Sequence, residues 1–113
     1  MHYRLLLFDA LNLQNTIFHL ETGKPEMASP TQTKTALIYL RDAGMSVELL
    51  RDLHHSEKRN ETYGGAISHL SKISEPREPN ITYYNRLLFV AKQHRETGEG
   101  FEIIVARARQ KFR

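Results

Sequence analysis

The chain alternates between short apolar segments and breaks at glycine and proline, and this pattern predicts its elements. Residues 5–8 form an uninterrupted apolar run that ends at Asp9, which is typical of a buried strand. Residues 12–20 then place apolar side chains at helical spacing. Residues 4–20 as a whole also keep a helical spacing, so one long helix is the alternative to a strand followed by a helix.

Two longer helices are predicted further along the chain, and each is followed by glycine and an apolar stretch. One covers residues 29–43 and begins with a serine cap and a proline. The other covers residues 81–97 and ends before a pair of nearby glycines. The apolar stretches that follow them, residues 45–52 and 101–106, are predicted to be strands.

An opening strand and helix, followed by two copies of helix, glycine and strand, predict an α/β fold. Its small sheet of about three strands would be flanked by helices, which supply the crossovers that parallel strands need. Residues 101–112 also fit a helix, so an all-α helical bundle is the alternative.

The middle of the chain is predicted to be less regular. Residues 54–60 form a polar stretch, in which His54 and His55 are expected to lie in a solvated loop. A short helix is expected to follow and to end at Ile73 with Ile67 and Leu70 buried, and the two prolines in residues 75–80 predict an extended, exposed connection.

The composition indicates one ordinary folded domain spanning residues 1–113. The absence of cysteine excludes disulfides, thiolate metal sites and a cysteine nucleophile. The longest apolar run has five residues, too few to cross a bilayer, and the N-terminus lacks a signal-peptide cleavage pattern. We therefore expect a cytoplasmic protein without a membrane partner.

Positive charge is concentrated at the C-terminal end, residues 107–113. Sixteen Lys and Arg against thirteen Asp and Glu give a net charge of +3, and without this segment the chain would carry a net −1. If the segment is extended, its alternate basic side chains share one face and suit a phosphate backbone; a solvated tail is the alternative. The predicted phosphate contacts are Arg107, Arg109, Lys111 and Arg113.

Two further segments carry chemistry that suits nucleic acid. Lys58 and Arg59 add a basic pair to the polar loop and are predicted to contact nucleic acid as well. Residues 83–86, Tyr-Tyr-Asn-Arg, mix aromatic rings with a cation, a combination used for stacking on nucleotides. At helical spacing Tyr84 can instead belong to the core.

Asp9 and Asn12 form the candidate metal site. A carboxylate at the carboxyl end of a strand, with an amide one helical turn later, suits Mg²⁺ or Mn²⁺. Residues 5–13 resemble the first strand and turn of PIN-like nucleases, closest to the flap-endonuclease and NYN branches. The resemblance implies that Asp9 is a metal ligand and that Asn12 supports it. The last predicted strand ends in basic residues where those families place carboxylates, which implies a minimal or inactive nuclease.

The pattern as a whole favours a small nucleic-acid-binding protein without catalytic activity. A more specific prediction is a minimal PIN-like nuclease that uses Mg²⁺ or Mn²⁺. If the protein is not such a nuclease, no cofactor is expected. One alternative is a helix-turn-helix regulator built from residues 31–43, 46–53 and 61–73. Another is a non-catalytic regulator or inhibitor that binds a protein partner.

Overall fold

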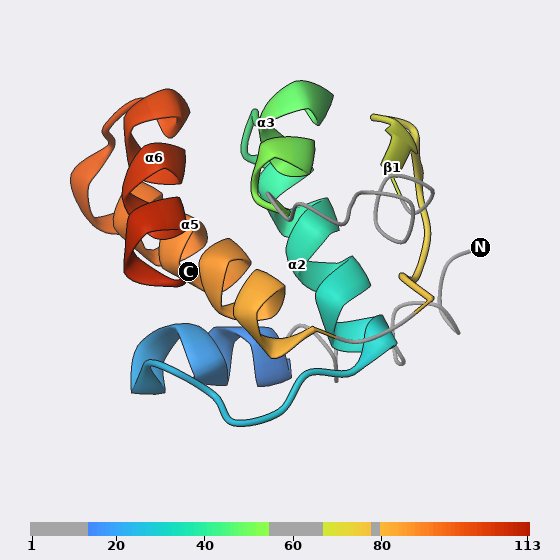
Figure 1. The fold of residues 1–113 in the computed structure, drawn as a ribbon, viewed down its shortest axis with the longest axis horizontal. Coiled ribbons are helices and arrows are strands. Elements are labelled where there is room, and N and C mark those ends of the chain that lie inside the picture. The colour runs from blue at the N-terminus through green and yellow to red at the C-terminus, as the bar shows by residue number, and fades with distance from the viewer. Residues whose placement is uncertain (1–13, 55–66, 78–79) are drawn as a thin grey trace.

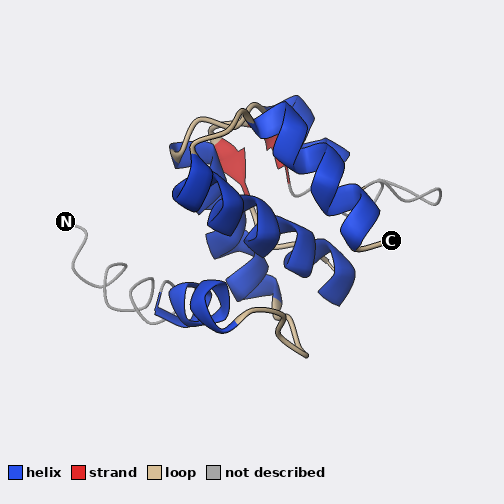
Figure 2. Ribbon diagram, turned by 90° about the vertical axis from the view of Figure 1, so that its left-hand side faces the viewer, coloured by secondary structure: helices blue, strands red, loops and turns tan. Residues whose placement is uncertain are grey.

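The computed structural model describes residues 14–54, 67–77 and 80–113, which are 65% helical. Figures 1 and 2 show the helices with one small hairpin beside them. The two described strands pair antiparallel, with Ile67 opposite Ile73. The elements are a helical segment at residues 14–22, α2 (Pro30–Asp42), α3 (Val47–Asp52), β1 (Ile67–His69), β2 (Lys72–Ile73), α5 (Ile81–Thr97) and α6 (Phe101–Lys111).

The two long predicted helices are confirmed, because each has strong local signals at its ends. The Ser29 side chain accepts a hydrogen bond from the first turn of α2, and Pro30 occupies the position where a helix tolerates proline. The Asn80 side chain caps α5 in the same way. Gly98 ends α5 in the left-handed conformation with φ of 72°, which glycine adopts without strain.

The two strands predicted after these helices are wrong, because both segments are helical. Residues 47–52 form α3, whose first turn is capped by the Ser46 side chain. Residues 101–111 form α6, in which Ile104, Val105 and Ala108 are buried at helical spacing. Packing on one face therefore overrides the preference of β-branched residues for strands. The expected three-stranded sheet is replaced by a two-stranded hairpin, and the opening strand at residues 5–8 lies outside the described residues.

The short helix predicted to end at Ile73 is also wrong over the described residues 67–73, which form the hairpin. Ile67 and Ile73 are buried as expected, but Leu70 lies at the turn and is 42% exposed. Arg51 and Arg41 donate hydrogen bonds to the carbonyls of Ile67 and Leu70, at 3.0 Å each. These donors come from α3 and α2, so the hairpin depends on side chains far away in the sequence.

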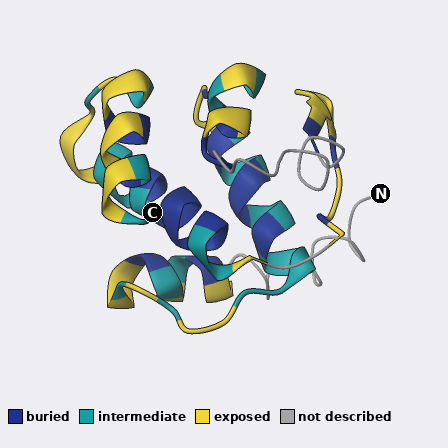
Figure 3. Ribbon diagram, in the orientation of Figure 1, coloured by how far each residue is buried: buried dark blue, intermediate teal, exposed yellow. Residues whose placement is uncertain are grey.

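The core lies between α5 and the helices around it. α5 packs against both α6 and α2, and Figure 3 shows buried residues along its length. His54, predicted to be solvated, is instead 5% exposed, and its ring meets Tyr83 edge-on at a centroid distance of 4.5 Å. Tyr84 is buried as well, which confirms its placement in the core.

Arg86 of α5 is a charged side chain buried inside this core, with 5% of its surface exposed. Its Nη1 donates to the carbonyls of Leu53 and His54 at 2.8 and 2.7 Å, and its Nε donates to the carbonyl of Phe112 at 2.6 Å. Burial, and secondarily the nearby Arg109, lowers the pKa of Arg86. The three carbonyls belong to residues that come directly after the C-terminal ends of α3 and α6. One guanidinium therefore caps both helices.

We expect Arg86→Met to lower the free energy of unfolding by about 2 kcal/mol or more, because buried carbonyls lose their donors. Relief of the repulsion with Arg109 offsets part of this loss. Urea denaturation measures the change. The matched control is Arg95→Met at an exposed position of α5, expected to stay within about 0.5 kcal/mol of wild type. Equal effects of the two substitutions would contradict the capping role of Arg86.

Candidate functional site

A pocket of about 580 Å³ lies where the helical segment at residues 14–22, α5 and the end of α6 meet. Figure 1 shows the blue helical segment below α5 and α6. Its lining combines lysines, aromatic rings and uncharged polar groups with aliphatic side chains. The size falls within the range of about 300–1,000 Å³ that is typical of small-ligand sites.

Three lysines give the pocket its positive charge: Lys24, Lys92 and Lys111. They come from the loop after residue 22, from α5 and from the last turn of α6. Among the described residues, Glu96 is the single carboxylate in the lining. Within the described part of the chain, none of the three ammonium groups is in an ion pair. We refer to Lys24, Lys92 and Lys111 as the lysine cluster.

Two phenylalanines form an aromatic wall beside the lysine cluster. The rings of Phe89 and Phe112 lie edge to face, with centroids 6.0 Å apart and an interplanar angle of 71°. The ammonium of Lys111 lies 5.8 Å from both ring centroids, and that of Lys24 lies 5.9 Å from Phe112. Cation–π attraction therefore holds the Lys24 and Lys111 ammonium groups at these rings.

Asn85 is one of the lining residues, and its side chain holds a buried acceptor that no donor matches. This side chain is 4% exposed, and its Oδ1 atom has no hydrogen-bond partner among residues 14–54, 67–77 and 80–113. A buried acceptor without a donor costs about 1–3 kcal/mol, and such atoms are uncommon in folded proteins. The protein thus keeps a polar group at this position although the fold does not use its oxygen.

His19 is also a lining residue and is hydrogen-bonded to Tyr84. Its Nδ1 is 2.9 Å from the Tyr84 hydroxyl, which also bonds to Thr16. Burial raises the pKa of Tyr84 to about 12, so the phenol stays protonated and can donate to Nδ1. Burial also lowers the pKa of His19. Both effects favour a neutral imidazole at neutral pH, so His19 adds no charge to the pocket.

The structure separates the basic residues that the sequence placed in one row. Because residues 101–111 are helical, Arg107 and Lys111 share a face while Arg109 lies on the other side. Arg107 forms a two-bond ion pair with Glu99, at 2.6 and 2.8 Å. Arg109 is half-buried near Arg86. The expected continuous row is therefore wrong.

Of the same basic residues, Lys111 lines the pocket and Arg113 is exposed. The other candidates, Asp9, Asn12, Lys58 and Arg59, lie outside the described residues. Their metal-binding and nucleic-acid-binding roles stay predictions. Within the described ranges, no group of three or more His, Asp or Glu side chains is placed to hold a metal ion.

Most of this pocket was not predicted from the sequence. The signal that was available is a stripe at helical spacing on α5: Asn85, Phe89, Lys92 and Glu96. Lys24 and Phe112 come from distant segments, and no local pattern relates them to α5.

No protein-family model matches the chain, and neither curated proteins nor solved structures show significant similarity to it. In the described part of the chain, no helix has both the length and the apolar character needed to cross a membrane.

The lowered pKa of His19 predicts that stability falls in acid. As the pH drops through 6.5, the ordinary value for histidine, the unfolded chain takes up a proton before the folded protein does. The free energy of unfolding contributed by neutral His19 is therefore present above pH 6.5 and is lost below it. Urea denaturation at pH 7.5 and 5.5 measures this change.

His19→Gln is the control, because glutamine can still accept from Tyr84 but does not titrate. We expect this variant to lose less stability between pH 7.5 and 5.5 than the wild type. An identical loss would show that other groups carry the whole pH dependence.

Proposed function

We propose that this protein binds nucleic acid at the pocket, with the lysine cluster contacting backbone phosphates. The supporting observation is the convergence of Lys24, Lys92 and Lys111, from three separate segments, on a pocket with one carboxylate. When such cations neutralise backbone phosphates, the small cations condensed on the nucleic acid are released, which drives binding. Arg113 extends the positive charge beyond the end of α6.

The aromatic wall makes nucleic acid a better match than a simple anion. Phe89 and Phe112 lie beside the lysine cluster, and single-stranded nucleic acids combine phosphates with flat bases that stack on such rings. The role is binding without catalysis. Metal-dependent cleavage is a separate prediction that depends on Asp9 and Asn12.

Fluorescence anisotropy with labelled DNA and RNA, titrated at low and physiological salt, tests the proposal. The variant replaces the whole lysine cluster with glutamine. We expect the slope of log affinity against log salt to become shallower by about 2 for single strands, because each neutralised phosphate contributes about 0.7 to that slope. Point variants are preferable to truncation at Ala106, because truncation would remove the buried Ala108 and the acceptor for Arg86.

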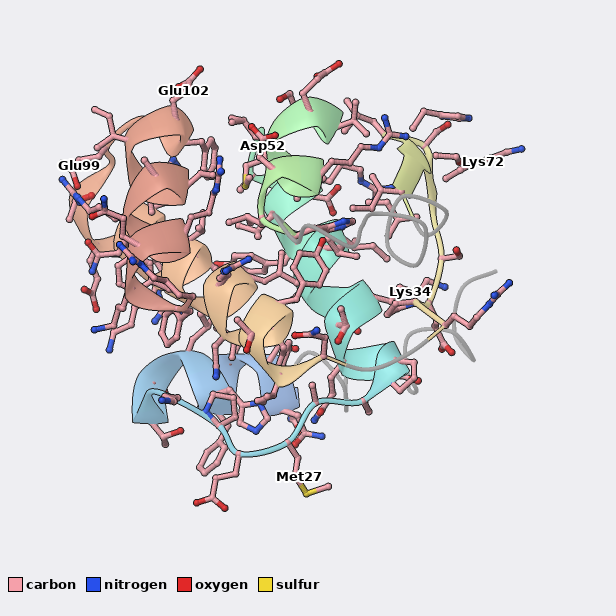
Figure 4. The ribbon with its side chains drawn as sticks, viewed as in Figure 1. Met27, Lys34, Asp52, Lys72, Glu99 and Glu102 are labelled. Carbon is pink, nitrogen blue, oxygen red and sulfur yellow. The ribbon has the colours of Figure 1, made fainter. Side chains whose placement is uncertain are left out.

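A matched variant removes three charges elsewhere: Lys34→Gln, Lys72→Gln and Arg77→Gln. Figure 4 shows Lys34 and Lys72 on the side of the molecule away from α6. This control is expected to keep the wild-type slope and nearly the wild-type affinity. If the two triple variants lost equal affinity for nucleic acid, binding would occur elsewhere on the protein or would be nonspecific. A wild-type protein that binds neither DNA nor RNA would refute the proposal.

A further inference from the structure

We infer that the pocket binds a phosphate monoester, the group found at the phosphorylated end of a nucleic-acid strand. The inference rests on the proposed function, because it assigns a ligand group to the same pocket. It makes the protein a reader of strand ends, with backbone phosphates as secondary contacts. A free mononucleotide carries the same group, and the two sources differ in whether further phosphates follow it.

The charge of the lining matches one phosphate monoester. Among the described lining residues, the lysine cluster contributes three positive charges and Glu96 contributes one negative charge, which leaves a net +2. A phosphate monoester carries about −1.5 to −2 near neutral pH, whereas an internal phosphate of the backbone carries a single negative charge. One monoester therefore neutralises the lining, while one internal phosphate leaves part of its charge unbalanced.

Two of the three ammonium groups are held at the same aromatic ring. The ammonium of Lys24 lies 5.9 Å from the ring centroid of Phe112, and that of Lys111 lies 5.8 Å from it. Cation–π attraction holds both groups there although like charges repel each other. A dianion that binds both ammonium groups offsets this repulsion, so a doubly charged phosphate gains more than a singly charged one.

Uncharged donors in the lining complement the oxygens of a phosphate. The Oδ1 atom of Asn85 is buried, so the accessible polar atom of this amide is the Nδ2 donor. In His19, Nδ1 accepts from the Tyr84 hydroxyl, so the proton of the neutral ring is on Nε2, which is also a donor. A phosphate monoester presents three acceptor oxygens, which suits a lining with ammonium, amide and imidazole donors.

The shape of the site favours the end of a strand over its interior. The helical segment at residues 14–22, α5 and the end of α6 all contribute to the lining of this space of about 580 Å³. An internal phosphate has a sugar on both sides, so the strand would have to enter the pocket and leave it again. A terminal phosphate has a sugar on one side only, so it enters without bending the strand.

The test compares oligo-dT strands of about 12 nucleotides at pH 7.5 and physiological salt, by fluorescence anisotropy with an internal label. One strand carries a 5′-phosphate, one a 3′-phosphate and one neither. An unphosphorylated strand two nucleotides longer has the same total charge as the phosphorylated strands, so it is the matched control. We expect at least one phosphorylated strand to bind about tenfold more tightly than this control.

Competition distinguishes a strand end from a free nucleotide. Thymidine monophosphate should displace the phosphorylated strand, and thymidine, which lacks the phosphate, should not. The mononucleotide should need a concentration at least about tenfold above that of the unlabelled phosphorylated strand, because it lacks the following backbone phosphates. Equal potency of the mononucleotide and the strand would identify a free nucleotide as the ligand and overturn the reading of strand ends.

Three variants test whether the preference belongs to the pocket. Glu96→Gln, at an exposed position of α5, should strengthen binding of the phosphorylated strand about threefold and that of the charge-matched control less. Glu102→Gln makes the same change of charge in the first turn of α6, outside the described lining, and should leave the preference unchanged. Asn85→Leu removes the Nδ2 donor at similar volume and should reduce the preference about threefold. Thermal unfolding checks that all three variants are folded.

The outcomes separate this inference from the proposed function. Equal affinity of the phosphorylated strands and the charge-matched control would overturn the monoester site while leaving backbone binding intact. A preference that stays unchanged in both Glu96→Gln and Asn85→Leu would place the monoester site outside the pocket and overturn the inference. Failure of all the strands to bind would refute the proposed function itself.

Discussion

The buried guanidinium of Arg86 is the constraint on which the arrangement of α3, α5 and α6 depends. It donates to carbonyls at the ends of α3 and α6, which would otherwise be buried without donors. A charge inside a core is unfavourable by itself, and here it is stabilised by backbone dipoles at two helix ends. The bond to the carbonyl of Phe112 also fixes the residue whose ring forms one wall of the pocket. One side chain thereby links the core to the candidate site.

Arginine and lysine have different roles in this structure. Arg41 and Arg51 hold the hairpin through its carbonyls, and Arg107 is paired with Glu99. The planar fork of arginine suits such fixed acceptors, whereas lysine acts as a flexible point charge. The lysines around the pocket remain available to a ligand. The net charge of +3 counts every cation equally, so it does not distinguish an arginine held in an ion pair from a lysine that lines the pocket.

Features set by neighbouring residues could be predicted from the sequence, and features set by distant residues could not. Helices α2 and α5 were predicted correctly because the signals at their ends are local. These signals are the caps at Ser29 and Asn80 and the left-handed Gly98 that ends α5. Residues 101–111 suit a strand or a helix, and packing of their apolar face against α5 decides for the helix. The hairpin depends on arginines from other helices, and the pocket joins three segments. Neither could be deduced from local spacing.

Asn85 and Arg86 are neighbours on α5 that show how one helix can serve both the core and a site. Successive residues point about 100° apart, so Arg86 reaches the ends of α3 and α6 while Asn85 lines the pocket. The Nε and Nη1 atoms of Arg86 have protein partners, but the Asn85 oxygen has none within the described residues. Phe112 connects the two sides, since its carbonyl bonds Arg86 and its ring lines the pocket. The hydrogen bond that orders the end of α6 therefore also holds one wall of the pocket.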